Sequence, residues 1–60
     1  MLDIHAVRSI YREFGIAVSA ARCKEDAECA ARFAVTDARS AELIRSWARA
    51  EEEGISVCEL

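Results

Sequence analysis

Apolar residues recur at alternating spacings of three and four over the first third of the chain. The stripe consists of Ile4, Val7, Tyr11, Phe14, Val18 and Ala21. Such spacing puts its members on one side of an α-helix and is typical of the seam along which two helices pack. Asp3 is a suitable N-cap, because its carboxylate can accept hydrogen bonds from free amides of the first turn. The pattern predicts a helix over about residues 4–22.

Gly15 lies inside this stripe and offers an earlier end for the helix, because glycine readily takes the left-handed conformation that follows a helix C-terminus. The apolar spacing nevertheless continues in phase through Val18 and Ala21. That continuity favours one helix with Gly15 beside the seam, where a glycine lets a neighbouring helix approach closely.

The second half of the chain has neither glycine nor proline between residues 27 and 53. On one continuous helix, Asp37 and Ser40 would interrupt the apolar side. The segment Val35-Thr36-Asp37 has the composition of a turn followed by a helix cap. We therefore expect two helices, over about 27–34 and 38–53, with one long helix as the alternative and Gly54 as the stop.

A second apolar stripe, built on Leu43, Ile44, Trp47 and Ala48, lies in the last of these segments. The expected fold is therefore all-α, with two or three amphipathic helices in one small domain spanning residues 1–60. Residues 55–60 alternate apolar and polar, and we expect them either to pack back on the helices or to form a flexible tail.

A chain of 60 residues buries only about 60% of the surface that its unfolded form exposes, so its core is thin. Small domains often gain stability from a second subunit. We accordingly expect a helical hairpin that dimerises into a bundle. The expected core and oligomer seam comprises Ile4, Val7, Tyr11, Phe14, Val18, Leu43, Ile44 and Trp47.

The charge balance narrows the choice of partners. Eleven acids against eight bases give a net charge of −3, whereas nucleic-acid-binding domains are usually basic. No stretch approaches the roughly 20 apolar residues that span a membrane, and no signal peptide is evident. The three cysteines are odd in number and lack CxxC spacing. We expect a cytoplasmic protein with reduced thiols and no membrane partner.

Candidate chemistry is sparse. His5 is the only histidine, and helical phasing turns it away from the apolar stripe toward solvent. Cys23, Cys29 and Cys58 could form a zinc site with His5 by count, but their separations do not match the paired ligands of structural zinc sites. We expect no catalytic, cofactor-binding or metal-binding residues, no small-molecule substrate, and no enzymatic activity.

The run Ala30-Ala31-Arg32-Phe33-Ala34-Val35-Thr36, followed by Trp47, is similar to transposase-type helix-turn-helix domains. This similarity covers under a third of the chain. Ala34 stands where those domains have a turn glycine, and Trp47 lies about one helical turn too far from Phe33. The resemblance implies a DNA-binding transcriptional regulator, and this reading is the alternative function.

Arg39, Arg45 and Arg49 form a ridge opposite Ile44 on the last predicted helix. Arginine on a rigid helix suits bidentate binding of carboxylates. We therefore predict a small non-enzymatic regulator or adaptor, with an inhibitor as one form, that binds a larger protein through these three arginines. The acidic run Glu51–Glu53, which opposes the helix dipole, is the competing surface.

Overall fold

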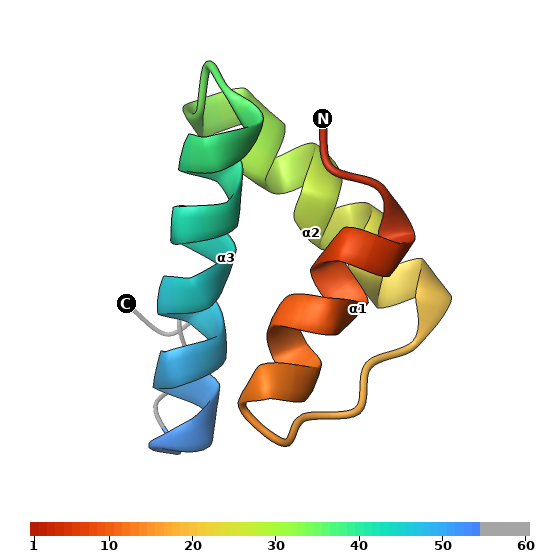
Figure 1. The fold of residues 1–60 in the computed structure, drawn as a ribbon, viewed down its shortest axis with the longest axis vertical. Coiled ribbons are helices and arrows are strands. Elements are labelled where there is room, and N and C mark those ends of the chain that lie inside the picture. Colours follow the sequence, from red (N-terminus) through yellow and green to blue (C-terminus); the bar gives the residue numbers. More distant parts are fainter. Residues whose placement is uncertain (55–60) are drawn as a thin grey trace.

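The computed structural model describes residues 1–54 and contains three helices in that range. They are α1 (Ile4–Glu13), α2 (Ala20–Phe33) and α3 (Asp37–Glu52), and each packs against the other two (Figure 1). The expected all-α class is confirmed. The tail predicted over 55–60 lies outside the described residues.

Helix α1 begins where the sequence predicts and ends much earlier. The Asp3 side chain accepts a hydrogen bond from the Ala6 N–H at 2.8 Å. Gly15 has φ +73°, its N–H donates to the Arg12 carbonyl, and the Ile16 N–H donates to the Tyr11 carbonyl. These two bonds form a Schellman motif, which satisfies carbonyls at the helix end. The prediction of one helix over 4–22 is therefore wrong: α1 ends at Glu13, and residues 20–22 belong to α2.

The apolar spacing continues past Gly15 although the helix ends before it. Residues 16–18 are non-helical chain, and Ile16 and Val18 are partly buried against the core from that connection. Side chains of an extended segment alternate between its two sides. Phe14 and Val18, four residues apart, can therefore both face the core without a helix between them. Periodicity alone could not separate the two conformations.

Helix α2 also begins earlier than the predicted residue 27. Ser19 is its N-cap and accepts a hydrogen bond from the Arg22 N–H at 3.2 Å. Residues 23–26, which lie between the predicted helices 4–22 and 27–34, are part of α2. Cys23 within it is fully buried, and Asp26 makes contacts described below.

The break between α2 and α3 confirms two helices in place of one long one. Three residues, 34–36, connect them, and the Thr36 side chain accepts from the Arg39 N–H at 3.2 Å. Gly54, with φ +80°, follows the end of α3, as expected of a helix stop.

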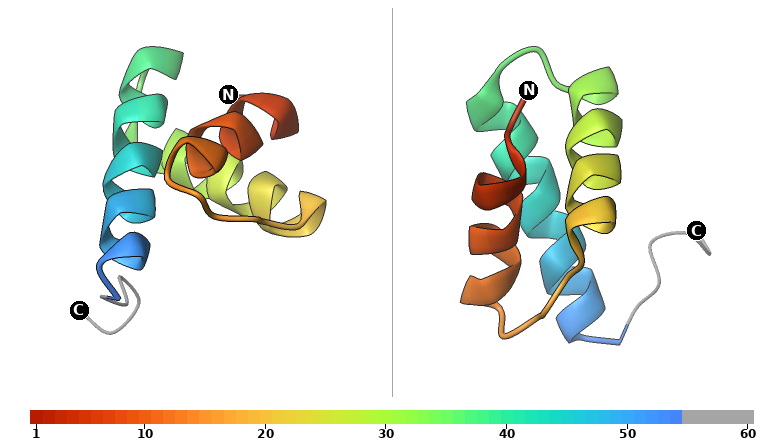
Figure 2. Two further views of the ribbon diagram at one scale, coloured as in Figure 1. Left: turned by 60° about the horizontal axis from the view of Figure 1, so that its bottom comes forward. Right: turned by 90° about the vertical axis from the view of Figure 1, so that its right-hand side faces the viewer.

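All three helices, which Figure 2 shows from two further sides, contribute side chains to the core. Its buried apolar residues are Val7, Ile10, Tyr11, Cys23, Ala27, Ala30, Ile44 and Ala48. Helix α2 contributes only small side chains, which let α1 and α3 pack close to its backbone. Among the residues of the predicted seam, Val7, Tyr11 and Ile44 are buried. The others, Ile4, Phe14, Val18, Leu43 and Trp47, are partly buried against this core.

Of the two or three helices expected, residues 1–54 form three, and these close into one bundle within the chain; the break at Gly15 separates α1 from a helix α2 that begins at Ala20. Dimerisation of the bundle stays a prediction. Across residues 1–54, no helix is both long and apolar enough to cross a membrane.

Candidate functional site

The predicted partner-binding arginines, Arg39, Arg45 and Arg49, are all exposed on α3. They lie on the side of the helix away from its buried residues Ser40, Ile44 and Ala48. The structure therefore presents them together on an outer surface, although their individual surroundings differ.

Arg45 takes part in packing between helices. Its Nη1 donates to Oε2 of Glu13 at 2.8 Å, which joins α3 to α1. Arg39 lies 3.8 Å from the Glu42 carboxylate within α3, and both side chains are about three-quarters exposed. Such an exposed pair contributes little to stability. Arg49 has no ion pair within residues 1–54. Arg39 and Arg49 are consequently freer than Arg45 to bind another molecule.

Large apolar side chains are exposed where α2 meets α3. Phe33 is 76% exposed, Val35 is fully exposed, and Met1 is 69% exposed. The Met1 amino group lies 3.1 Å from Oδ1 of Asp37, which places the N-terminus beside the first residue of α3. Figures 1 and 2 show the N-terminus and the α2–α3 connection at the same end of the bundle. We call these three residues the apolar end.

The apolar end is not among the surfaces that the sequence pattern predicts. The inner stripe of α2 contains Cys23, Ala27 and Ala30, and its next member at helical spacing is Ala34. Phe33 therefore falls to one side of the stripe. The spacing of these small residues is the sequence signal that predicts an exposed Phe33.

A polar cluster joins the three helices. The Tyr11 hydroxyl of α1 donates to Oδ2 of Asp26 in α2. Arg22, also in α2, lies over the Tyr11 ring with its Cζ 5.1 Å from the ring centroid. Arg22 Nη2 in turn lies 2.8 Å from Oε1 of Glu51 in α3. We call Tyr11, Arg22, Asp26 and Glu51 the interhelix cluster.

The electrostatics of this cluster favour a structural role. Burial raises the pKa of Tyr11, and the hydrogen bond to Asp26 raises it further. The bond to Glu51 is the largest contribution that raises the pKa of Arg22. A general acid or base works best with a pKa near the operating pH, and both shifts lead away from neutrality. The cluster therefore holds the helices together and is poorly suited to proton transfer.

The other candidate residues are dispersed. Cys23 is buried and Cys29 is exposed, while Cys58 lies outside the described residues. His5 is exposed on α1. Residues 1–54 contain no group of three or more histidine, cysteine or acidic side chains placed to hold a metal ion.

Comparisons with known proteins supply no relative for this bundle. The chain matches no protein-family model, no curated protein and no solved structure.

Proposed function

We propose that this protein is a small non-enzymatic regulator or adaptor that binds a larger protein, with inhibition as one form of that role. The binding surface comprises the apolar end and the exposed arginines of α3. The observation that supports the proposal is the exposure of Phe33 and Val35 in a chain whose core contains three alanines and a cysteine.

The energetics of the apolar end favour a bound state. Burying a valine or phenylalanine side chain is favourable by about 1.5–3 kcal/mol, and the isolated chain leaves Phe33 and Val35 in water. Aromatic and arginine side chains are also enriched among the residues that dominate protein–protein binding. Arg39 lies in the first turn of α3, close in sequence to both apolar residues, so one partner could engage all three.

Tagged variants can test this surface. In pull-downs quantified by mass spectrometry, Phe33→Ser with Val35→Ser should lose partners that the unaltered chain retains. Arg39→Gln with Arg49→Gln should weaken the same partners, and Arg45 is left intact because it pairs with Glu13. Lys24→Gln, on an exposed part of α2, is the control. Equal recovery by all variants, each with unchanged helicity, would argue against the proposed surface.

The alternative is a helix-turn-helix DNA-binding regulator. One observation favours it: a three-residue connection leads from α2 into an N-capped helix with arginines on its outer surface. Exposed Asp37 and Glu42 lie on that same helix, however, and would repel phosphates. DNA affinity that falls steeply with added salt would support this alternative over protein binding.

We also propose a cytoplasmic location and a homo-oligomeric state. The exposed thiol of Cys29 fits a reducing compartment, in which it stays free. Leu43 and Trp47, partly buried on α3, are the apolar side chains that a second copy could cover. Neither proposal requires a cofactor or a small-molecule substrate.

A further inference from the structure

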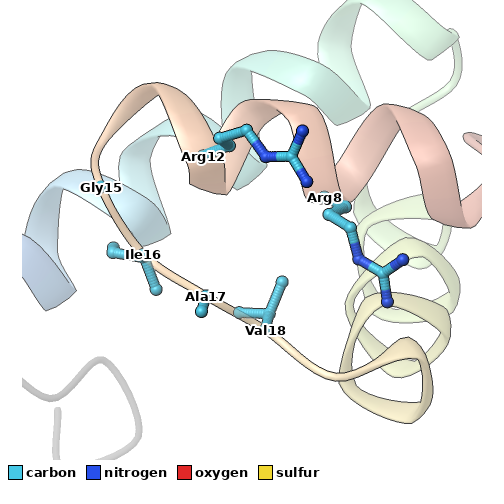
Figure 3. Close-up of a pocket in the computed structure, with 6 residues that line it drawn as sticks. All are labelled: Arg8, Arg12, Gly15, Ile16, Ala17 and Val18. Carbon is cyan, nitrogen blue, oxygen red and sulfur yellow. The ribbon is translucent and has the colours of Figure 1, made fainter.

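A groove separate from the α3 surface lies between α1 and the connection to α2 (Figure 3). Its volume is about 370 Å³, within the range of about 300–1,000 Å³ that is usual for ligand sites. The lining residues are Arg8, Arg12, Gly15, Ile16, Ala17 and Val18. Figure 3 shows the two arginine side chains extending from α1 on one side and residues 15–18 on the other.

The two arginines give this groove a concentrated positive charge. Arg8 and Arg12 are one helical turn apart on α1, and neither takes part in any ion pair within residues 1–54. Like charges at this spacing repel each other. The neighbouring Glu13 cannot neutralise them fully, because it is directed to Arg45 of α3. An anionic ligand would relieve the repulsion.

The opposite wall combines apolar side chains with unengaged backbone. Ile16 and Val18 are partly buried and alternate with exposed Ala17. Within residues 1–54, the N–H groups of Ala17 and Val18 donate to no protein acceptor. An N–H group without a protein acceptor is available as a hydrogen-bond donor to a ligand that lies along this connection.

We propose that this groove binds an extended peptide segment in which acidic residues alternate with apolar ones. Arg8 and Arg12 are separated by about 6 Å along the helix axis, at 1.5 Å per residue. Alternate side chains of an extended strand are separated by about 6.6 Å and lie on the same side. Two acids at positions i and i+2 therefore match the two guanidinium groups.

The residues between the acids face the other way. Since successive side chains of a strand point to opposite sides, an apolar residue between the acids would face Ile16 and Val18. This alternation distinguishes a peptide from a small inorganic anion, which would use the arginines and leave the apolar wall uncovered. The inference does not depend on the proposed function, because it concerns a different surface and different residues.

Fluorescence anisotropy with a short labelled peptide of alternating glutamate and valine tests the site on the full chain. Arg8→Gln with Arg12→Gln should weaken binding about fivefold or more, as expected for loss of two exposed ion pairs. Lys24→Gln with Arg32→Gln, two exposed residues of α2, changes the net charge equally and should leave binding unchanged. Circular dichroism establishes that both variants keep their helices.

Altered peptides test the two kinds of contact separately. Replacing glutamate by glutamine should abolish the salt dependence of binding, and replacing valine by serine should weaken binding at constant charge. Equal loss of binding in the Arg8/Arg12 and Lys24/Arg32 double variants would overturn the proposal by showing nonspecific attraction. Inorganic phosphate at matched ionic strength is the second test. If it displaced the peptide and bound with equal affinity, the peptide proposal would be overturned in favour of a simple anion site.

Discussion

The hydroxyl of Tyr11 donates a hydrogen bond to Oδ2 of Asp26 at 2.5 Å, and this bond joins α1 to α2. The tyrosine residue is only 1% exposed, so its hydroxyl needs a protein partner. Asp26 provides it, and Arg22 lies close to both groups. The bond between Tyr11 and Asp26 therefore connects the buried core to Arg22, which in turn pairs with Glu51 of α3.

Tyr11→Phe should destabilise the protein measurably while keeping the ring in the core. The substitution removes a hydrogen bond to a charged acceptor, a type of bond worth about 1.5–3 kcal/mol. The Asp26 side chain is 20% exposed, so water can recover part of this amount. Urea unfolding followed by circular dichroism should therefore show a loss of about 1–2 kcal/mol. A change under about 0.3 kcal/mol would mean that the bond contributes nothing to stability.

Alkaline pH should unfold the protein through Tyr11. Burial and the hydrogen bond to Asp26 raise the pKa of Tyr11 above its ordinary value of about 10. Because the folded pKa exceeds the unfolded one, the stabilising effect is complete below about pH 10 and is lost as pH rises toward the folded pKa. The chain has one tyrosine, so tyrosinate absorbance reports this residue alone. Ionisation near pH 10 with all helices intact would contradict the expected coupling.

Gly15→Ala should destabilise the bundle by about 1 kcal/mol or more, because Gly15 has φ +73°. An added Cβ would meet no other atom within 4 Å, so the effect is conformational and not steric crowding from neighbours. Gly15→Asn is the matched control and should lose less stability, since asparagine tolerates the left-handed region better. Similar unfolding midpoints for the alanine variant and the unaltered protein would argue against the Schellman motif.

These substitutions also show which parts of the fold the sequence could reveal. Asp3 and Thr36 have local capping signatures, and the start of α1 and the break before α3 follow from them. Gly15 followed by apolar Ile16 is a local signal for the end of α1, although the periodicity of the stripe favours a longer helix. The pairing of Arg22 with Glu51, across 29 positions, depends on helix packing that no local pattern specifies.

The candidate surface could be predicted from the sequence only in part. Helical phasing correctly placed Arg39, Arg45 and Arg49 on the outside of α3. It could not show that Glu13 engages Arg45, because the two residues meet only when α1 packs against α3. Nor could it show that Phe33 and Val35 lie outside the core, since that depends on the register of α2.

The proposed homo-oligomer can be checked by light scattering at micromolar concentration. A dimer should give about twice the 6.6 kDa mass of the chain. Because Val7 and Tyr11 are buried within one bundle, the dimer contact would fall on partly buried residues such as Leu43 and Trp47. A single-chain mass over the whole concentration range would exclude a stable dimer.

Site-specific photo-crosslinking tests the proposed binding surface most directly. A photoreactive phenylalanine analogue in place of Phe33 should, on irradiation in native lysate, form a discrete covalent adduct with a larger protein. The same analogue in place of Lys24, exposed elsewhere on α2, should not. An adduct specific to position 33, identified as protein by mass spectrometry, is the predicted result. Absence of an adduct at position 33, or equal labelling from both positions, would contradict protein binding at the apolar end.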